Sequence, residues 1–199
     1  MKKIIFTLLI SLSCATAFAQ KTKEKVIEST ATEFPVKDGL LYYEGVVQVD
    51  PNSKQADLYR AGRTWFVDTY VDAKEVLQLD DKADGKMMGK GRYKYAFVNG
   101  INISQILMGF TLALDVKDGK YRYRIYNFHG DNRNTSMLGG ANATNIYAVN
   151  YDQCYADYKA DKRTKYNLKV LQGMDAQVQG IVASLQKAMT SPTVGKDDF

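Results

Sequence analysis

The clearest pattern of apolar and polar positions along the chain is a strict alternation on both sides of Asp118-Gly119. Alternating runs that flank an Asp-Gly dipeptide are typical of a β-hairpin, so residues 106–128 are predicted to form one. A tight turn at this dipeptide fixes the pairing, with Leu114 opposite Tyr123 and Asp115 opposite Arg122. One face of the hairpin is then apolar: Phe110, Leu112, Leu114, Val116, Tyr121, Tyr123 and Ile125. The other face carries Thr111, Ala113, Asp115, Arg122, Arg124 and Tyr126.

Three further runs are predicted to be strands, over residues 40–49, 75–80 and 86–95. In the third run, one side carries Met88 and three cationic side chains, Lys90, Arg92 and Lys94. The other side carries Met87, Gly89, Gly91, Tyr93 and Tyr95. Residues 96–105 are predicted to be a loop that leads into the hairpin.

Two segments follow helical spacing instead. The first begins after Asp50-Pro51, where Asn52 or Ser53 is expected to cap the helix, and it continues to about Tyr70 with Trp65 and Phe66 on its apolar face. The second begins at Leu168 and ends before Pro192. Its apolar stripe comprises Leu168, Leu171, Met174, Val178, Ile181, Val182, Leu185 and Met189. Both helices need an apolar sheet face as a partner.

The order strand, helix, four strands, helix predicts an α+β fold, with both helices on one face of a curved antiparallel sheet of about five strands. This is the order of one repeat of the TATA-binding-protein (TBP-like) fold. Four stretches strengthen the likeness: Phe34-Pro35-Val36, Trp65-Phe66, Gly89-Lys90-Gly91 and the run 116–123. Over residues 34–129 the chain resembles an uncharacterised family of exported proteins from Bacteroides and related bacteria, described as having a TBP-like fold. The resemblance implies a fold and an exported location, but no activity and no site residues.

The first 19 residues are predicted to be a cleaved export signal. Lys2 and Lys3 precede an apolar run, and Ala17-Phe18-Ala19 is a small-residue cleavage site before Gln20. Lipid attachment at Cys14 is the less favoured alternative, because the residues before it match a lipoprotein processing site poorly. Cleavage leaves 180 of the 199 residues, which suits one domain. No stretch of this remainder reaches the ~18–20 apolar residues of a membrane span.

Within the remaining chain, residues 20–33 are predicted to be a flexible lead-in and residues 34–190 the folded domain. Residues 130–166 are rich in Gly, Asn and Tyr and are predicted to be a long, partly ordered loop. Residues 191–199 are predicted to be a loose tail. Only Cys154 remains after cleavage, so no internal disulfide is expected.

The candidate ligand-binding surface is the polar side of the sheet. Loss of Lys2 and Lys3 lowers the formal net charge from +5 to +3, which matters only if the cations gather on one surface. Lys90, Arg92 and Lys94 on one strand, with Arg122, Arg124 and Tyr126 on another, are predicted to form such a basic, partly aromatic surface. It suits an anionic glycan or a lipid head group. The competing interpretation is that alternating strands simply place charges in water.

An enzyme is not predicted. A hydrolase would need His129 and Cys154 with Asp131 or Asp152, and nothing in their spacing supports it. No cofactor and no metal site are predicted. Nucleic acid is excluded as a partner, because TATA-binding protein uses two such repeats in the nucleus whereas this chain has one repeat and an export signal.

The sequence therefore predicts an exported, non-catalytic binding or interaction module of the periplasm or cell surface. The alternative is a protein-interaction component that uses the Tyr-rich segment 147–166, since exposed tyrosines provide large contact areas. The competing interpretation of that segment is a cover packed over the sheet or its edge.

The export prediction can be tested on protein isolated from its native host. We expect the intact mass to correspond to a chain that begins at Gln20 and carries no lipid. A mass that corresponds to a chain beginning at lipid-modified Cys14 would overturn this prediction.

Overall fold

The computed structural model describes residues 29–70, 77–138 and 144–190. The strands are β1 (Val36–Lys37), β2 (Leu40–Gln48), β3 (Leu77–Asp81), β4 (Lys86–Asn99), β5 (Asn102–Lys117), β6 (Lys120–Ser136) and β7 (Thr144–Asn150). The helices are α1 (Gln55–Thr69), α3 (Tyr151–Lys159) and α4 (Thr164–Thr190). The predicted export signal, most of the lead-in and the predicted tail lie outside the described residues.

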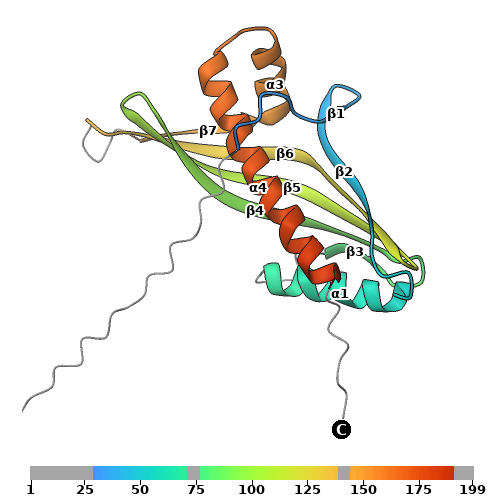
Figure 1. Cartoon of the computed structure of the whole chain (residues 1–199). Coiled ribbons are helices and arrows are strands. Elements are labelled where there is room, and N and C mark those ends of the chain that lie inside the picture. The colour runs from blue at the N-terminus through green and yellow to red at the C-terminus, as the bar shows by residue number, and fades with distance from the viewer. Residues whose placement is uncertain (1–28, 71–76, 139–143, 191–199) are drawn as a thin grey trace, which may run out of the picture.

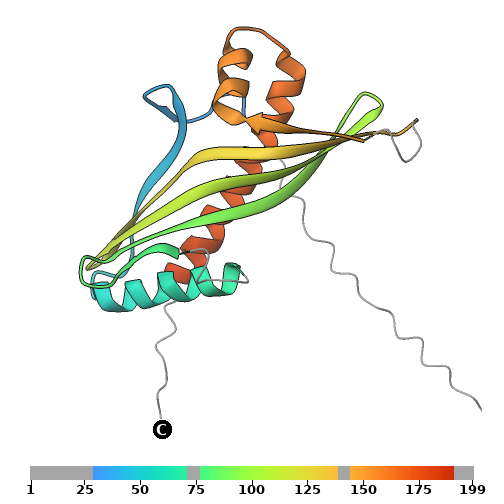
Figure 2. The same cartoon turned by 180° about the vertical axis from the view of Figure 1, so that it is seen from behind.

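The strands form one antiparallel sheet in the order β1-β2-β6-β5-β4-β3, and β7 also pairs with β6. Helices α1 and α4 cover one face of this sheet, and α4 crosses it diagonally (Figure 1). Seen from behind, the opposite face has no helix over it (Figure 2). The predicted α+β class, with two helices on one sheet face, is confirmed. The additional elements are β1, β7 and α3, which packs beside α4 and against β2 and β6.

The predicted register of the central hairpin is confirmed. Leu114 pairs with Tyr123 and Asp115 pairs with Arg122, and the turn closes where Lys117 pairs with Lys120. Gly119 has a φ of +69°, a left-handed conformation that glycine adopts without steric cost. Six of the seven side chains predicted for the apolar face are buried, and Tyr123 is half-buried.

Two predicted loops are wrong. Strands β4 and β5 continue through residues 96–105 and meet at a tight turn where Asn99 pairs with Asn102. The described residues within 130–166 belong mainly to the end of β6, then β7, α3 and the start of α4. The prediction failed in β6 because this strand contains a β-bulge. Gly109 pairs with His129 whereas Thr111 pairs with Tyr126, so β6 has one extra residue between these pairs. The extra residue reverses the alternation of inward and outward side chains beyond it, which hides a continuing strand from a search with period two.

The start of α1 is capped from outside the helix. The N-cap residue is Lys54, and neither Asn52 nor Ser53 caps the helix through its side chain as predicted. Instead, the Gln55 N–H donates to Asp118 Oδ1 at 2.7 Å, so the hairpin turn supplies the capping oxygen. The Gly119 N–H also donates to the Ser53 carbonyl at 2.9 Å. The turn between β5 and β6 is therefore fastened directly to α1.

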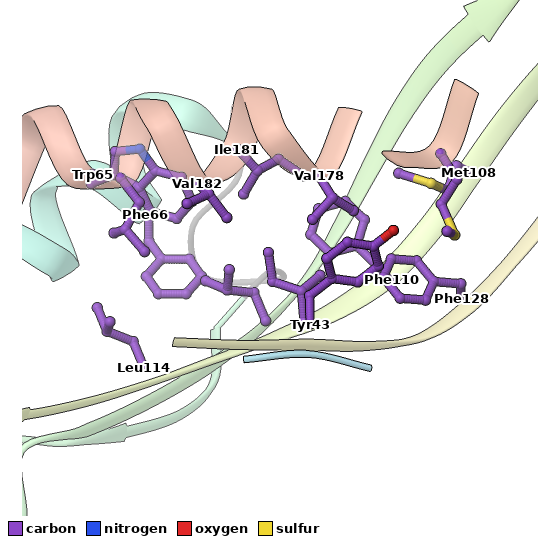
Figure 3. Close-up of a cluster of buried hydrophobic side chains, with 14 of the residues drawn as sticks. Tyr43, Trp65, Phe66, Met108, Phe110, Leu114, Phe128, Val178, Ile181 and Val182 are labelled. Carbon is purple, nitrogen blue, oxygen red and sulfur yellow. The ribbon is translucent and has the colours of Figure 1, made fainter. Parts of the chain in front are cut away.

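The core lies between the sheet and helices α1 and α4 (Figure 3). Trp65 and Phe66 of α1 pack edge to face, with ring centroids 5.2 Å apart, and Trp65 Nε1 donates to Ser184 Oγ of α4 at 3.0 Å. In α4, a Cβ at Gly173 would lie only 2.2 Å from the Tyr95 ring. A glycine at this position thus lets the helix lie directly on the sheet. Burial of large apolar side chains, at roughly 25 cal/mol per Å², is the main source of stability here.

The register makes a stability prediction. Leu114 is fully buried, so Leu114→Lys should lower the free energy of unfolding by about 3–5 kcal/mol by forcing a charge into the core. The matched control is Gln105→Lys on the same strand, which is exposed on the other face and should change stability by less than about 0.5 kcal/mol. Urea unfolding curves would measure both. Equal midpoints for Leu114→Lys and the parent would mean that the register is wrong by one residue.

Candidate functional site

The sheet face without helices, which we call the open face, is seen in Figure 2. The strand registers place all six side chains that the sequence analysis singled out on this face. On β4, Lys90, Arg92 and Lys94 are exposed. On β6, Arg122 is exposed, and Arg124 and Tyr126 are half-buried. The structure thus brings the predicted residues onto one face, on strands separated by β5.

The two β6 arginines are tied to acids. Arg122 donates to Asp115 Oδ2 from Nε at 3.0 Å and from Nη2 at 2.9 Å, and Arg124 Nη2 donates to the same oxygen at 2.8 Å. Arg122 Nη1 also lies 3.6 Å from Glu44 Oε1 on β2. The hydrogen bonds to Asp115 raise the pKa of the Arg122 guanidinium. Two carboxylates therefore balance the two arginines, and this half of the open face has little net charge.

The β4 cations differ in this respect. The side chains of Lys90, Arg92 and Lys94 form no hydrogen bond and no ion pair with any residue that the structure describes. As alternate residues of one strand they are spaced roughly 7 Å apart. Their partners on β5 are Thr111, Gly109 and Leu107, none of which is charged. The unbalanced positive charge of the open face is concentrated in this row.

The same row lies on a free strand edge. Strand β3 pairs with β4 only as far as Gly89, and from Lys90 to Asn99 the described chain has no strand on that side of β4. Cationic side chains on an edge strand hinder pairing with a strand from another molecule. Protection of the edge is therefore a second physical explanation for these three residues.

Tyr126 has a packing role as well. Its ring stacks on Tyr42 of β2 with centroids 5.6 Å apart, and its hydroxyl lies 3.6 Å from Met88 Sδ. Lys37 Nζ lies 5.0 Å from the centroid of the Tyr42 ring. These contacts hold an aromatic pair on the open face beside the arginines.

The structure does not bring His129 and Cys154 together. The His129 ring lies over Gly109 on the open face, where a Cβ on Gly109 would approach Nε2 to 2.5 Å. Cys154 lies in α3 and is half-buried against the core on the helix side. Burial and the nearby Asp157 carboxylate raise the pKa of the thiol from 9.0 to about 11. This raised pKa is the opposite of what activates a nucleophilic cysteine.

The Tyr-rich segment 147–166 packs mainly against the domain. Tyr151 is fully buried, and its hydroxyl lies 2.9 Å from that of Tyr95. Tyr155 and Tyr158 contact Phe34 edge to face at 6.4 and 6.3 Å. Among the five tyrosines of this segment only Tyr147 is exposed. The segment therefore acts as a cover over the helix side of the sheet.

A pocket that sequence reasoning missed lies where this cover meets the far end of the sheet. It has a volume of about 560 Å³ and is lined by Asn99, Asn134, Tyr147, Arg163, Thr164, Lys165 and Tyr166. The residues come from β4, β6, β7 and the first turn of α4 with the turn before it. The only sequence signal was the polar inward positions of β6, and the bulge concealed it.

Two negative findings concern the described residues only. They contain no group of three or more His, Cys, Asp or Glu side chains placed to hold a metal ion. None of their helices combines the length and apolar character needed to cross a membrane.

The environment of Cys154 predicts its reactivity. A rise in pKa from 9.0 to about 11 lowers the thiolate fraction at pH 8 from about a tenth to about a thousandth. Iodoacetamide should therefore label the native chain 20–199 about 100-fold more slowly than the same chain unfolded in urea. Native labelling as fast as unfolded labelling would show that the pKa of the thiol is not raised, and faster labelling would show an activated thiol and restore the cysteine-hydrolase hypothesis.

Comparisons with known proteins agree with this architecture. None of the curated proteins searched matches the chain. A crystal structure of a TBP-like protein from Parabacteroides distasonis superposes with a TM-score of 0.60 at 13% identity, covering 79% of this chain and 97% of that one. A crystal structure of a DUF4468 family protein from Bacteroides ovatus gives a TM-score of 0.54 at 16% identity, covering 81% of this chain and 92% of that one. Residues 43–130 match the family model described as a domain of unknown function (DUF4468) with TBP-like fold. The resemblance predicted from the sequence is therefore confirmed: residues 43–130 match this family model, and the chain shares the TBP-like fold of the two crystal structures.

Proposed function

We propose that this chain is an exported, non-catalytic binding module of the cell envelope, whose open face holds an anionic polymer or head group. The observation that supports this most is the row of Lys90, Arg92 and Lys94, three exposed cations without an acidic partner among the described residues. Because Arg122 and Arg124 already bind Asp115, they contribute less than the sequence analysis expected. The proposal therefore centres on β4.

The expected strength of binding follows from the exposure of these charges. An exposed ion pair contributes roughly 0.2–1 kcal/mol and is screened by salt, with a Debye length of about 10 Å at 0.1 M. Three cations spaced roughly 7 Å apart along one strand can contact successive charges of a polymer together. Binding should thus be weak for single anions, stronger for polyanions and strongly dependent on salt.

The test removes the row. Lys90→Gln, Arg92→Gln and Lys94→Gln together should abolish retention on dextran sulfate and on phosphatidylglycerol vesicles at low salt, while the thermal unfolding midpoint stays nearly constant. The control is the triple variant Arg60→Gln, Lys82→Gln and Lys187→Gln, which removes the same net charge from exposed positions off the open face. The two probes distinguish a polysaccharide from a lipid source of the anion.

A second variant should act in the opposite direction. Asp115→Asn removes the charge that balances Arg122 and Arg124, so retention on the same matrix should shift to higher salt.

If the β4 variant is retained as well as its charge-matched control, the cations only protect the strand edge. The edge interpretation would also be favoured if the β4 variant associates into oligomers while the parent does not.

A further inference from the structure

The pocket beneath the Tyr-rich segment 147–166 differs from the predicted open face in the side chains that line it. Its lining contains two cationic side chains, Arg163 and Lys165, and no acidic side chain. Both cations are exposed, and neither side chain forms an ion pair or a hydrogen bond with the residues that the structure describes. Their charge is therefore available to a ligand at the rim of the pocket.

The start of α4 adds to this positive potential. This helix has 27 residues and begins at Thr164, so its partial positive charge lies at the pocket. The N–H groups of Tyr166 and Asn167 already donate to the Arg163 carbonyl. Those of Thr164 and Lys165 donate to no group within the described chain. The Asp161 carboxylate also lies at this end, where it accepts from Thr164 Oγ1 at 2.7 Å. Two open amides and two cations outweigh this one acid and favour an anionic group here.

The floor of the pocket is neutral and polar. The hydroxyls of Tyr147 and Tyr166 line it and lie 3.0 Å from each other. Behind them, the fully buried Asn132 donates from Nδ2 to the hydroxyl of Tyr147 at 2.8 Å and to that of Tyr166 at 3.0 Å. The Oδ1 atoms of Asn132 and Asn134 are buried and have no hydrogen-bond partner. Burial raises the pKa of the Tyr166 phenol, so this group is neutral at physiological pH. The floor thus offers amides and hydroxyls in an arrangement that suits neutral hydroxyl groups rather than a second charge.

Two phenol rings complete the lining. Tyr147 is 40% exposed and Tyr166 is half-buried against Phe97, with ring centroids 5.9 Å apart. Tyrosine rings combine an apolar face with a polar tip, which suits a ring that is itself apolar on its faces and hydroxylated at its edge. The volume of about 560 Å³ lies within the range of about 300–1,000 Å³ that is usual for small-ligand sites.

From these features we infer that the pocket binds a carboxylate-bearing sugar, such as a uronic acid unit of a glycan. Arg163 and Lys165 hold the carboxylate, with the amides at the start of α4 close by. Asn99, Asn134 and the hydroxyls of Tyr147 and Tyr166 bind the sugar hydroxyls. This site lies on the helix side of the sheet and is independent of the open face.

The experiment uses the mature chain and defined probes. Digalacturonic acid should bind in isothermal titration at least tenfold more tightly than its neutral analogue α-1,4-digalactose and than inorganic phosphate. In ¹H–¹⁵N spectra it should shift the side-chain amides of Asn99 and Asn134 and the backbone amides of Thr164 and Lys165. These shifts locate the site on the unmodified protein, so the test does not depend on a variant that folds.

Variants then separate the contributions. Arg163→Gln with Lys165→Gln should weaken the binding of digalacturonic acid at least tenfold and leave that of α-1,4-digalactose unchanged. Lys162→Gln is the matched control, because it removes an exposed cation from the same turn but does not line the pocket. Replacing Lys90, Arg92 and Lys94 should leave this binding unchanged, and the pocket variant should leave retention on dextran sulfate unchanged, so the two proposals can fail separately.

Three results would overturn the inference. The first is the absence of any digalacturonic acid binding up to 50 mM. The second is binding that the Arg163 and Lys165 variant does not weaken. The third is phosphate binding as tight as that of digalacturonic acid, which would mean that the pocket recognises an anion and no sugar.

Discussion

The register of the β5–β6 hairpin decides the chemistry of both sheet faces. With Leu114 opposite Tyr123, every second residue of the two strands enters the core that α1 and α4 cover. A slip by one residue would bring Arg122, Arg124 and Asp115 into that core and expose the leucines. The cost of burying these charges is several times what a marginally stable domain can tolerate, so the register is firmly specified. The separation of an apolar face from a charged face follows from this one constraint.

The sequence was informative wherever alternation was uninterrupted and the turn residues were distinctive. Leu112, Leu114 and Val116 alternate without a break up to Asp118-Gly119, and the register predicted from them is the one observed. The prediction failed beyond Asn127, where the bulge reverses the phase and the inward positions become Asn132 and Asn134. Period-two reasoning needs both a constant phase and apolar inward residues, and this stretch offers neither.

The candidate sites, too, could be predicted from the sequence only in part. The positions of Lys90, Arg92 and Lys94 on one face follow from strand geometry alone, and the structure has them there. The pairing of Asp115 with Arg122 follows from the hairpin register. The second contact of Asp115, with Arg124, depends on side-chain placement across the two strands, for which a single sequence carries little signal. The lining of the pocket is assembled from four segments, and the pairing of β7 with β6 had to be known first.

The polar lining of the pocket also has a geometric origin. Helix α4, with 27 residues at about 1.5 Å each, is on the order of 40 Å long. Strand β5, with 16 residues at about 3.3 Å each, is roughly 50 Å long. A helix that lies diagonally cannot back the whole of a longer sheet (Figure 1). The end of the sheet beside the first turn of α4 carries Ser104, Asn132 and Asn134 on its inward side, in place of the leucines and phenylalanines that the helices bury elsewhere, and the hydroxyls of Tyr147 and Tyr166 lie against Asn132 there.

The capping of α1 by Asp118 has a consequence for the order of folding. The oxygen that receives the Gln55 N–H lies 63 residues further along the chain, so the helix gains this cap only after the hairpin has formed. A contact of such long range forms only after the intervening chain has closed on itself, which slows folding. During synthesis from the N-terminus, α1 would emerge from the ribosome well before its cap exists. The helix and the hairpin should therefore gain their final stability in one cooperative step, late in folding, rather than one after the other.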